Sequence, residues 1–566
     1  MSFERRIRRG DRTYVYEIES YREKGKVKQR YLGYLGVEKE TPEGTIFIPA
    51  HKEILDRIVL TNNVHLGDVY VLYHITKELK ISEVIDSHSI KGGGLPSGNQ
   101  LILMAMNHAI SPRSLNRFGS WYEDTALPQI TDITPEKLNK DNLSSAMDGI
   151  CREIRNKDGE IIRVVDKTLD ICKDLVKIWS ELYDIPLDAL YYDITSTYFE
   201  GAKCILAKLG YSRDKKKGKV QINVALVVTR KWRFPICFMV YTGDTSDQKT
   251  VKNILSTIRN EFDITNCTII WDRGMVSKTN IRRVDRCHQK IVCGLKGSEV
   301  EIKDILLSVQ KDDLQKKENI VRELDDDEKI YAVAFVKKIY NKRRKIVVYL
   351  NTQKQKDAHK KRDFKLKSAR IKLGKYKKKL ERGNYQELGP VSNHFKECVK
   401  GVSRFFKPRY NKNDKITIDW IYHSDKVKKA IELDGRFALM STDLDMICKE
   451  IVDAYFEKDD IEKAFRYFKQ VAKLHPTRCW LENRVRVHVF ICFLAYLLSK
   501  VLEYKLRVNG LKITAEMALD ELGKIKQGVL IDPTTKYSVV KVTRLSKIQT
   551  KIINVLGLSG YLNSES

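Results

Sequence analysis

The chain has 566 residues, 42% of them hydrophobic, which is enough apolar material for a large buried core. Lysine and arginine number 104 against 74 acidic residues, a net charge of +30, so we expect a polyanionic partner, either nucleic acid or an anionic membrane surface. The first residues are charged and the longest apolar run, VFICFLAYLL, has ten residues, so we expect neither a secretory leader nor a membrane-spanning helix, and nucleic acid becomes the favoured partner.

The first 185 residues divide into a strand-rich start and a helical remainder. Residues 1–50 alternate apolar and polar side chains on either side of EKGK, which predicts a β-hairpin that turns near Gly25. Residues 51–185 show helical spacing, for example in DVYVLYHITKEL and SSAMDGICREIRN, with a turn-rich interruption, KGGGLPSGNQ, at 91–100. We therefore predict a mostly helical N-terminal region after the hairpin.

Strand patterns dominate 186–300. Short runs rich in β-branched and aromatic residues predict five strands, in ALYYDITSTYFE, VQINVALVVT, FPICFMVYTG, CTIIW and KIVCGLKG. Helical spacing lies between the third and fourth of them, in DQKTVKNILSTIRNEF. Antiparallel strands followed by a strand–helix alternation predict the first part of a mixed α/β core.

The segment 301–442 is predicted to be an insertion into this core. It contains strand patterns (KIYAVAFVKK, KIVVYL and GRFALMST) and a basic arm, 352–382, in which 14 of 31 residues are Lys or Arg and three are acidic. Leu366, Leu373 and Leu380 recur at intervals of seven, which predicts a helix with one packed side over part of the arm. We expect the basic arm to contact a nucleic-acid backbone, and the alternative is a charged face that is simply solvated.

Two acidic residues occupy informative positions on the predicted strands. Asp193 lies inside the strand run YYDITSTYFEG, where a buried and unpaired charge would be costly. Asp272 directly follows the strand CTIIW, and α/β folds tend to place site residues at the carboxyl ends of strands. Each residue also has an explanation without a catalytic role: an outward-facing strand position for Asp193 and an ordinary turn for Asp272. Between them, Asp244 and Asp247 fit loop acids better than supporting groups.

Helical spacing resumes after residue 442, and we predict that 443–508 forms the last part of the core. The tail, 509–566, is predicted to form a helix, a strand and a helix. Within 443–508, YFEKDDIEKAFRYFK taken as one helix places a mixed set of side chains on one face: Tyr455, Lys458, Glu462, Arg466 and Lys469. The other acids of the stretch, Glu457, Asp459 and Asp460, fall outside this face. Glu462 is therefore the acid that geometry singles out, although an amphipathic surface helix with a Glu462–Arg466 pair explains the same spacing.

These motifs together resemble the DDE transposases of the insertion-sequence-four type. The third-acid region of that family reads Tyr, two residues, Arg, three residues, Glu, six residues, Lys, and Tyr455, Lys458, Glu462 and Lys469 match this spacing. Lys458 stands where Arg is usual, which keeps the charge but loses the bidentate fork. YYDITSTYFEG resembles the first-acid region and WDRGM the second. SYREKGKVKQRYLGYLG and HPTRCWLENRVRVHVFICFLAYLL resemble the long branch of the group, so the likeness covers most of the chain.

The resemblance implies an α/β fold with a ribonuclease H-like mixed-sheet core, interrupted by a β-rich insertion domain and preceded by a mostly helical N-terminal region. The expected divisions are the hairpin region 1–50, a helical DNA-binding region 51–185, core 186–300, insertion 301–442, core 443–508 and a tail subdomain 509–566. Asp193 and Asp272 would lie on core strands and Glu462 on the helix after the insertion. The three carboxylates would act as the catalytic set and bind Mg²⁺ or Mn²⁺, as two ions. Tyr455, Lys458 and Lys469 would contact DNA phosphate, and the helical face adds Arg466 as a further DNA contact.

The expected activity is metal-dependent cleavage and joining of double-stranded DNA at the terminal inverted repeats of an element and at its target. A homodimer in the active complex, no membrane partner and a nucleoid-associated, cytoplasmic place in bacteria or archaea follow from the same likeness. The 11 cysteines, without a CxxC pair, fit reduced thiols in a cytoplasm. Two alternatives stay open: a non-catalytic or domesticated DNA-binding derivative, and a metal-dependent nuclease without strand transfer.

Overall fold

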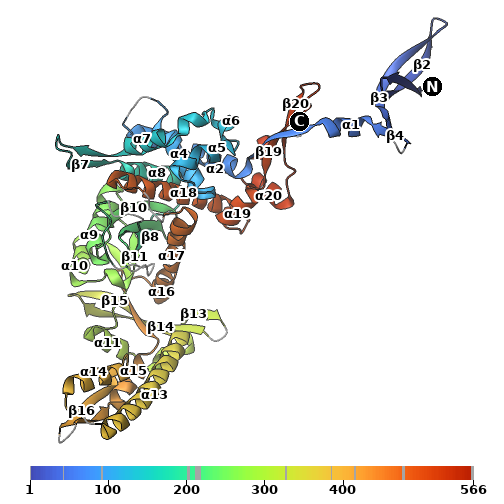
Figure 1. The fold of residues 1–566 in the computed structure, drawn as a ribbon. Coiled ribbons are helices and arrows are strands. Elements are labelled where there is room, and N and C mark those ends of the chain that lie inside the picture. Colours follow the sequence, from blue (N-terminus) through green and yellow to red (C-terminus); the bar gives the residue numbers. More distant parts are fainter. Residues whose placement is uncertain are drawn as a thin grey trace. The chain divides into compact units, whose positions relative to one another are not determined.

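A computed structural model of the chain describes residues 2–41, 44–90, 94–199, 204–210, 218–325, 328–383, 385–412, 416–474 and 479–562. Figure 1 shows the elements along the chain. The described chain forms two compact units, one from 1–149 together with 497–566 and one from 150–496. The second unit contains all the predicted catalytic residues.

The first unit begins with an antiparallel sheet of four strands, β1 (Ser2–Arg9), β2 (Arg12–Glu23), β3 (Lys26–Thr41) and β4 (Gly44–Pro49). The predicted hairpin is confirmed, because β2 and β3 pair across Lys24 and Gly25, which both have positive φ. The helices that follow in this unit are α1 (Ala50–Arg57), α2 (Gly67–Glu78), α3 (Ile81–His88), α4 (Ser97–Ile110), α5 (Phe118–Glu123), α6 (Leu127–Thr131) and α7 (Lys140–Ile150).

The tail of the chain belongs to the same unit. Its elements are α19 (Ala515–Leu522), β19 (Lys526–Ile531), β20 (Ser538–Val542), α20 (Lys547–Val555) and α21 (Ser559–Leu562). β19 lies between β20 and β5 (Val59–His65) in a three-stranded antiparallel sheet. The helix, strand and helix predicted for the tail are confirmed, and β20 was not predicted.

The second unit is organised around a mixed sheet of nine strands. Their order is β10 (Pro235–Thr242), β9 (Gln221–Thr229), β8 (Ala189–Tyr198), β11 (Thr268–Trp271), β12 (Lys290–Gly294), β18 (Arg436–Ser441), β15 (Lys342–Asn351), β14 (Glu328–Ile339) and β13 (Ile320–Asp325). β8, β9 and β10 are antiparallel neighbours, whereas β11 runs parallel to both β8 and β12. All five strands predicted between 186 and 300 are present, as one half of this sheet.

Helices cover both faces of the β8–β11 part of the sheet. α9 (Asp247–Ser256) and α10 (Lys278–Arg286) lie on one side, and α16 (Cys448–Phe456) and α17 (Asp459–Arg466) on the other (Figure 1). Adjacent residues of β8 show the two faces: Tyr192 donates a hydrogen bond from Oη to Thr250 of α9, and Tyr191 donates one to the carbonyl of Ala454 in α16. Residues that alternate along β8 therefore point to different helical layers.

One helix of the described chain, α18 (Glu482–Val508), is long and apolar enough to cross a membrane by length and composition, and 83% of its apolar window is buried inside the protein. Its first part packs aromatic side chains against β10, with the rings of Phe490 and Phe493 next to that of Phe238. α18 therefore acts as a core helix.

The segment 301–442 does not form a separate β-domain. β13, β14, β15 and β18 continue the main sheet, because β18 pairs with β12 on one side and β15 on the other. The remainder of the segment forms a lobe with its own core, made by α13 (Thr352–Arg382), α14 (Leu388–Cys398), β16 (Phe406–Lys412), β17 (Ile416–Tyr422) and α15 (Ser424–Leu433). Most of the predicted strands of this segment therefore extend the core, and the lobe that remains is mainly helical, unlike the β-rich insertion domain that was expected.

One predicted helix ends earlier than its pattern indicates. In SSAMDGICREIRN, α7 stops at Ile150 and Cys151–Arg155 forms β6, which pairs with β7 (Ile161–Asp166). The turn between these strands is held by Asn156, whose side-chain oxygen accepts hydrogen bonds from the backbone of Asp158 and Glu160. A polar turn that closes a hairpin thus overrides the helical spacing. α8 (Thr168–Tyr183) then leads into the main sheet.

Candidate active site

The two strand carboxylates, Asp193 and Asp272, lie at matching positions on neighbouring parallel strands. Tyr192 of β8 is the register partner of Trp271 of β11, and each aspartate directly follows one of these residues. Parallel neighbours in a sheet are about 4.8 Å apart, and paired residues point to the same face. The sheet therefore brings the strand carboxylates side by side, on the face that carries Tyr191 and is covered by α16 and α17.

Asp272 receives two groups from α16 and the turn after it. Tyr455 donates a hydrogen bond from Oη to Oδ1 of Asp272 at 3.3 Å, and Nζ of Lys458 lies 3.8 Å from the same oxygen. Lys458 is only 7% exposed, so its ammonium group depends on this carboxylate for compensation. Burial, followed by the charge of Asp272, raises the pKa of Tyr455, so the phenol stays protonated as a donor.

A glycine makes this approach of Tyr455 possible. Gly294 ends β12, and a Cβ placed on it would lie 2.5 Å from Oη and 3.0 Å from Cζ of Tyr455. Contacts that short do not occur between real atoms, so any side chain at this position would displace the phenol. Gly294 therefore helps to set the position of Tyr455 relative to Asp272.

The stretch treated as one helix in the sequence is two helices. α16 ends at Phe456 and α17 begins at Asp459, and carbonyls at the break are bound by side chains from β8 and from the turn between β9 and β10. Tyr191 donates to Ala454 O at 3.1 Å and Arg233 donates to Glu457 O at 3.4 Å. The backbone amides that would have used these carbonyls bond to the carbonyl three residues back instead of four, Lys458 to Tyr455 O and Ile461 to Lys458 O.

This break corrects the assumption behind the single helical face. Tyr455 lies on α16, Lys458 in the turn, and Glu462 and Arg466 on α17, while Lys469 belongs to the π-helical turn Tyr467–Val471. The contacts that cause the break come from residues far away in the sequence. Local spacing therefore did not contain the information needed to predict it.

Glu462 is exposed on α17, a helix that contacts β8. It forms no hydrogen bond or ion pair with the described residues, and the Glu462–Arg466 pair of the alternative interpretation does not form. Ile461, Ala464 and Phe465 supply the buried side of the helix. Of the predicted set, the structure thus brings together Asp193, Asp272, Tyr455 and Lys458, and leaves Glu462 and Arg466 on the exposed side of α17.

The donor chemistry of the strand carboxylates fits a hard divalent cation, because adjacent carboxylate oxygens are the ligands that Mg²⁺ prefers. The buried ammonium group of Lys458 beside Asp272 also shows that positive charge is stabilised at this position. Across the described ranges, however, no three His, Cys, Asp or Glu side chains are grouped so that they could hold a metal ion. The structure places Asp193 and Asp272 on the same face of the sheet, and all three expected metal ligands stay predictions.

Asp247 is a further carboxylate near Asp272, although its sequence context favoured a loop acid. It begins α9, after the end of β10, a strand that runs in the same direction as β8. A Cβ on Gly274 would lie 3.3 Å from Oδ2 of Asp247 and 4.0 Å from Oδ2 of Asp272, so both carboxylates flank one point. The signal available in the sequence was its position just after a third strand of the predicted core.

A buried amide connects the loops that carry these two acids. Asn280, only 1% exposed, donates from Nδ2 to the carbonyl of Gln248 at 2.9 Å and to that of Met275 at 2.8 Å. Gln248 follows Asp247 and Met275 lies three residues after Asp272. One side chain thus sets the separation of the two loops. Asp244, by contrast, is exposed and accepts a hydrogen bond from Thr242, as a loop acid does.

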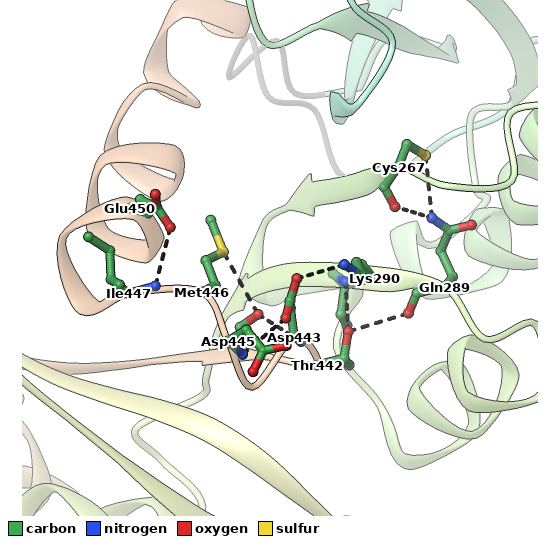
Figure 2. Close-up of polar contacts among 11 residues, drawn as sticks. Cys267, Gln289, Lys290, Thr442, Asp443, Asp445, Met446, Ile447 and Glu450 are labelled. Carbon is green, nitrogen blue, oxygen red and sulfur yellow. Dashed lines mark hydrogen bonds and ion pairs between the residues drawn. The ribbon is translucent and has the colours of Figure 1, made fainter.

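A second polar network fixes the start of α16 where the chain returns from the lobe. Figure 2 shows Thr442, just after β18, bound to the backbone of β12 and its preceding residue: its Oγ1 accepts from Ile291 N and donates to Gln289 O. Lys290 pairs with Asp443 at 2.9 Å, and Glu450 accepts a hydrogen bond from Ile447 N at the start of α16. These contacts attach the segment between β18 and α16 to β12, a strand of the sheet that carries Asp272.

Comparison with known proteins connects this geometry to a family. No curated protein is significantly similar to the chain in sequence. A cryo-EM structure of a piggyBac transposase synaptic complex with hairpin DNA is similar over 82% of this chain and 81% of that chain, with 11% identity and a TM-score of 0.36. The profile of the family described as "Transposase DDE domain" matches residues 185–498, more than half of the chain, from just before β8 into α18. The protein thus belongs to the DDE-domain transposase family.

Proposed function

We propose that the protein is a DDE transposase of the insertion-sequence-four type that binds the ends of a DNA element, cleaves them and joins them to target DNA. The observation that carries the proposal is the placement of Asp193 and Asp272 at matching positions on parallel β8 and β11, facing α16 and α17. We infer that β10, β9, β8, β11 and β12 form a ribonuclease H-like core. Glu462, from α17, is the third carboxylate of the proposal.

Asp193, Asp272 and Glu462 would hold Mg²⁺ or Mn²⁺, as two ions. When bound, such ions activate an attacking oxygen and stabilise a leaving oxygen of a phosphodiester. The protein's own contribution is placement: β8 and β11 hold two carboxylates in fixed register, and α17 carries the third on a short helix anchored by Ile461, Ala464 and Phe465.

The groups around the strand carboxylates suit a phosphate substrate. Tyr455 is kept protonated beside Asp272, and its one O–H would turn from Asp272 to a phosphate oxygen when DNA binds. Arg466 is exposed on α17 and, together with Lys458 and Lys469, is proposed to contact DNA phosphate near the cleaved end. A homodimer with paired DNA ends, acting in the cytoplasm of a bacterium or archaeon at the nucleoid, completes the proposal.

The test is cleavage and joining of element-end DNA by the full chain in Mg²⁺. We expect Glu462→Gln to lose cleavage by roughly 10³-fold, similar to the loss of a preorganised catalytic donor. Asp459→Asn, another exposed acid at the start of the same helix, is the matched control and should keep wild-type cleavage.

Three results would contradict parts of this proposal. Wild-type cleavage by a folded Glu462→Gln protein would remove Glu462 from the catalytic set. Cleavage without a joined product would support the nuclease alternative. Tight DNA binding by the wild-type protein without any metal-dependent nicking would support the non-catalytic derivative.

A further inference from the structure

Helix α13 is a single helix of 31 residues with one side packed onto the lobe. Its buried side consists of Arg362, Leu366, Ala369, Leu373, Tyr376 and Leu380. The leucines pack into a core that includes Val391, Phe395 and Ile418. Arg362 forms a buried ion pair with Asp434, with Nη1 2.6 Å from Oδ1. The orientation of α13 about its axis is therefore fixed, and so is the set of residues on its outer side.

The outer side of α13 carries a stripe that runs opposite the buried one. From Lys360 onward, at 100° per residue, the side chains farthest from the core are Lys360, Phe364, Lys367, Ile371, Lys375, Lys378 and Arg382. All seven are exposed and none of them is an acid, and Asp357 lies on the same side of the helix just before Lys360. Phe364 is 75% exposed and Ile371 61%, and they lie one heptad apart in the middle of the cations.

The cations of the outer stripe are not neutralised by the protein. Within the described residues, none of its five cations forms an ion pair. The cations of the N-terminal sheet differ, since Arg6 pairs with Glu38 at 3.0 Å and Arg30 with Glu19 at 2.8 Å. Several cations of that sheet are thus paired, whereas those of the outer stripe are left open, where they can attract a polyanion.

The dimensions of the outer stripe match duplex DNA. From Lys360 to Arg382 the helix rises about 33 Å, longer than the major groove is wide (about 12 Å), so residues near its ends can reach phosphates on both sides of the groove. The major groove is wide enough for an α-helix, and an apolar side chain such as Phe contacts the thymine methyl group there. Resting on the transposase function proposed above, we propose that the outer stripe of α13 lies in the major groove of duplex DNA, with its cations on phosphates and Phe364 and Ile371 toward the bases.

The experiment measures binding of a 40-base-pair duplex to the full chain at several salt concentrations by fluorescence anisotropy. We expect the triple variant Lys367→Gln, Lys375→Gln, Lys378→Gln to bind at least about tenfold more weakly and to reduce the salt slope by about three, because each lost phosphate contact removes roughly one unit. The control triple, Lys426→Gln, Lys428→Gln, Lys429→Gln, changes three exposed lysines of α15 in the same lobe and should bind as the wild type does. Equal effects of the two triples, or no effect of either, would overturn the proposal.

The apolar residues give an independent readout. Phe364→Ala should weaken binding about three- to tenfold with an unchanged salt slope, since a base contact releases no counterions. Val300→Ala, at another exposed apolar residue of the same unit, should have no effect. Unchanged binding by Phe364→Ala would overturn the groove placement.

Competition with polyglutamate of equal charge identifies the kind of partner. Displacement of the duplex at equal charge would overturn the assignment to DNA, whereas resistance to it would support the assignment. None of these variants touches the carboxylates, so failure here leaves the cleavage test of Glu462 to be decided separately.

Discussion

The strand half and the helix half of the candidate site are held by very different means. Asp193 and Asp272 follow paired residues of two neighbouring strands, in a sheet that is covered on both faces. Glu462 lies on an eight-residue helix that begins after a break, with exposed residues at both of its ends. The first pair is set by sheet register, and the third acid by a turn whose carbonyls are held by Tyr191 and Arg233.

Sheet register and a short helix hold a side chain with different rigidity. A sheet register cannot shift by one residue without moving every side chain to the other face, so it provides positions that do not drift. A short helix joined through a side-chain-capped turn can change its angle by breaking two hydrogen bonds, each of which contributes about 1 kcal/mol. We therefore expect the strand half to tolerate changes in its surroundings and the helix half to be sensitive to them.

The largest effect should come from the strand carboxylates themselves. Asp193→Asn and Asp272→Asn should each lower DNA cleavage by roughly 10³-fold or more, because both remove a charged oxygen from the centre of the site. They should differ in stability, since only Asp272→Asn leaves the buried Lys458 without its partner, at a cost of about 1 kcal/mol given that the Asp272 side chain is 42% exposed. Urea denaturation of both variants measures this difference, and equal stabilities would show that Lys458 does not depend on Asp272.

The next effect should come from Asp247, the acid that the sequence did not single out. Asp247→Asn should lower cleavage about 10–100-fold, the range for groups that orient metal ligands, without changing the denaturation midpoint. Asp244→Asn is the matched control, because Asp244 is exposed and bonded only to its own loop in the described structure. A metal titration of cleavage gives the second readout: Asp247→Asn should require more Mg²⁺ than the wild type, and an unchanged requirement would leave Asp247 a structural residue.

The strand half was predictable because its causes are local. Short runs of β-branched and aromatic residues located β8 and β11, and the position of Asp272 at the end of a strand marked it as a site candidate. Local patterns also predicted that the basic arm is a helix with a packed leucine side. In each case the residues that decide the structure lie within a few positions of one another.

The helix half was not predictable in the same way. The break at Glu457 and Lys458 arises because Tyr191 and Arg233, more than two hundred residues away, bind two helix carbonyls. The approach of Tyr455 to Asp272 depends on Gly294 at the end of β12, and the whole lobe lies between Gly294 and Tyr455 in the sequence. Likewise, β13 to β15 joined the main sheet through β18, a long-range pairing that no strand pattern specifies.

A smaller effect is expected from the glycine that admits Tyr455. Gly294→Ala places a methyl group where Oη of Tyr455 now lies, so the phenol must move away from Asp272. We expect cleavage to fall by about tenfold, comparable to the loss of one supporting group around a metal ligand. Tyr455→Phe in the Gly294→Ala background should then have little further effect. Independent, multiplicative losses from the two changes would contradict a shared cause.

The smallest effect concerns the ion pair that supports the break itself. Burial alone raises the pKa of Glu457, but the hydrogen bond and charge of Arg230, the hydrogen bond of Tyr191 and the charge of Arg233 together hold that pKa below its ordinary value. A lowered pKa in the folded state means that Glu457 stabilises the protein above the unfolded pKa of about 4.3, and that this contribution is lost as the pH falls through the folded pKa. Wild type should therefore be more stable than Glu457→Gln at pH 7, by well under about 1 kcal/mol because the pair is partly exposed, and the difference should vanish in acid. Denaturation midpoints between about pH 3 and 7 measure this, and a difference that persists in acid would mean that Glu457 acts through packing instead of charge.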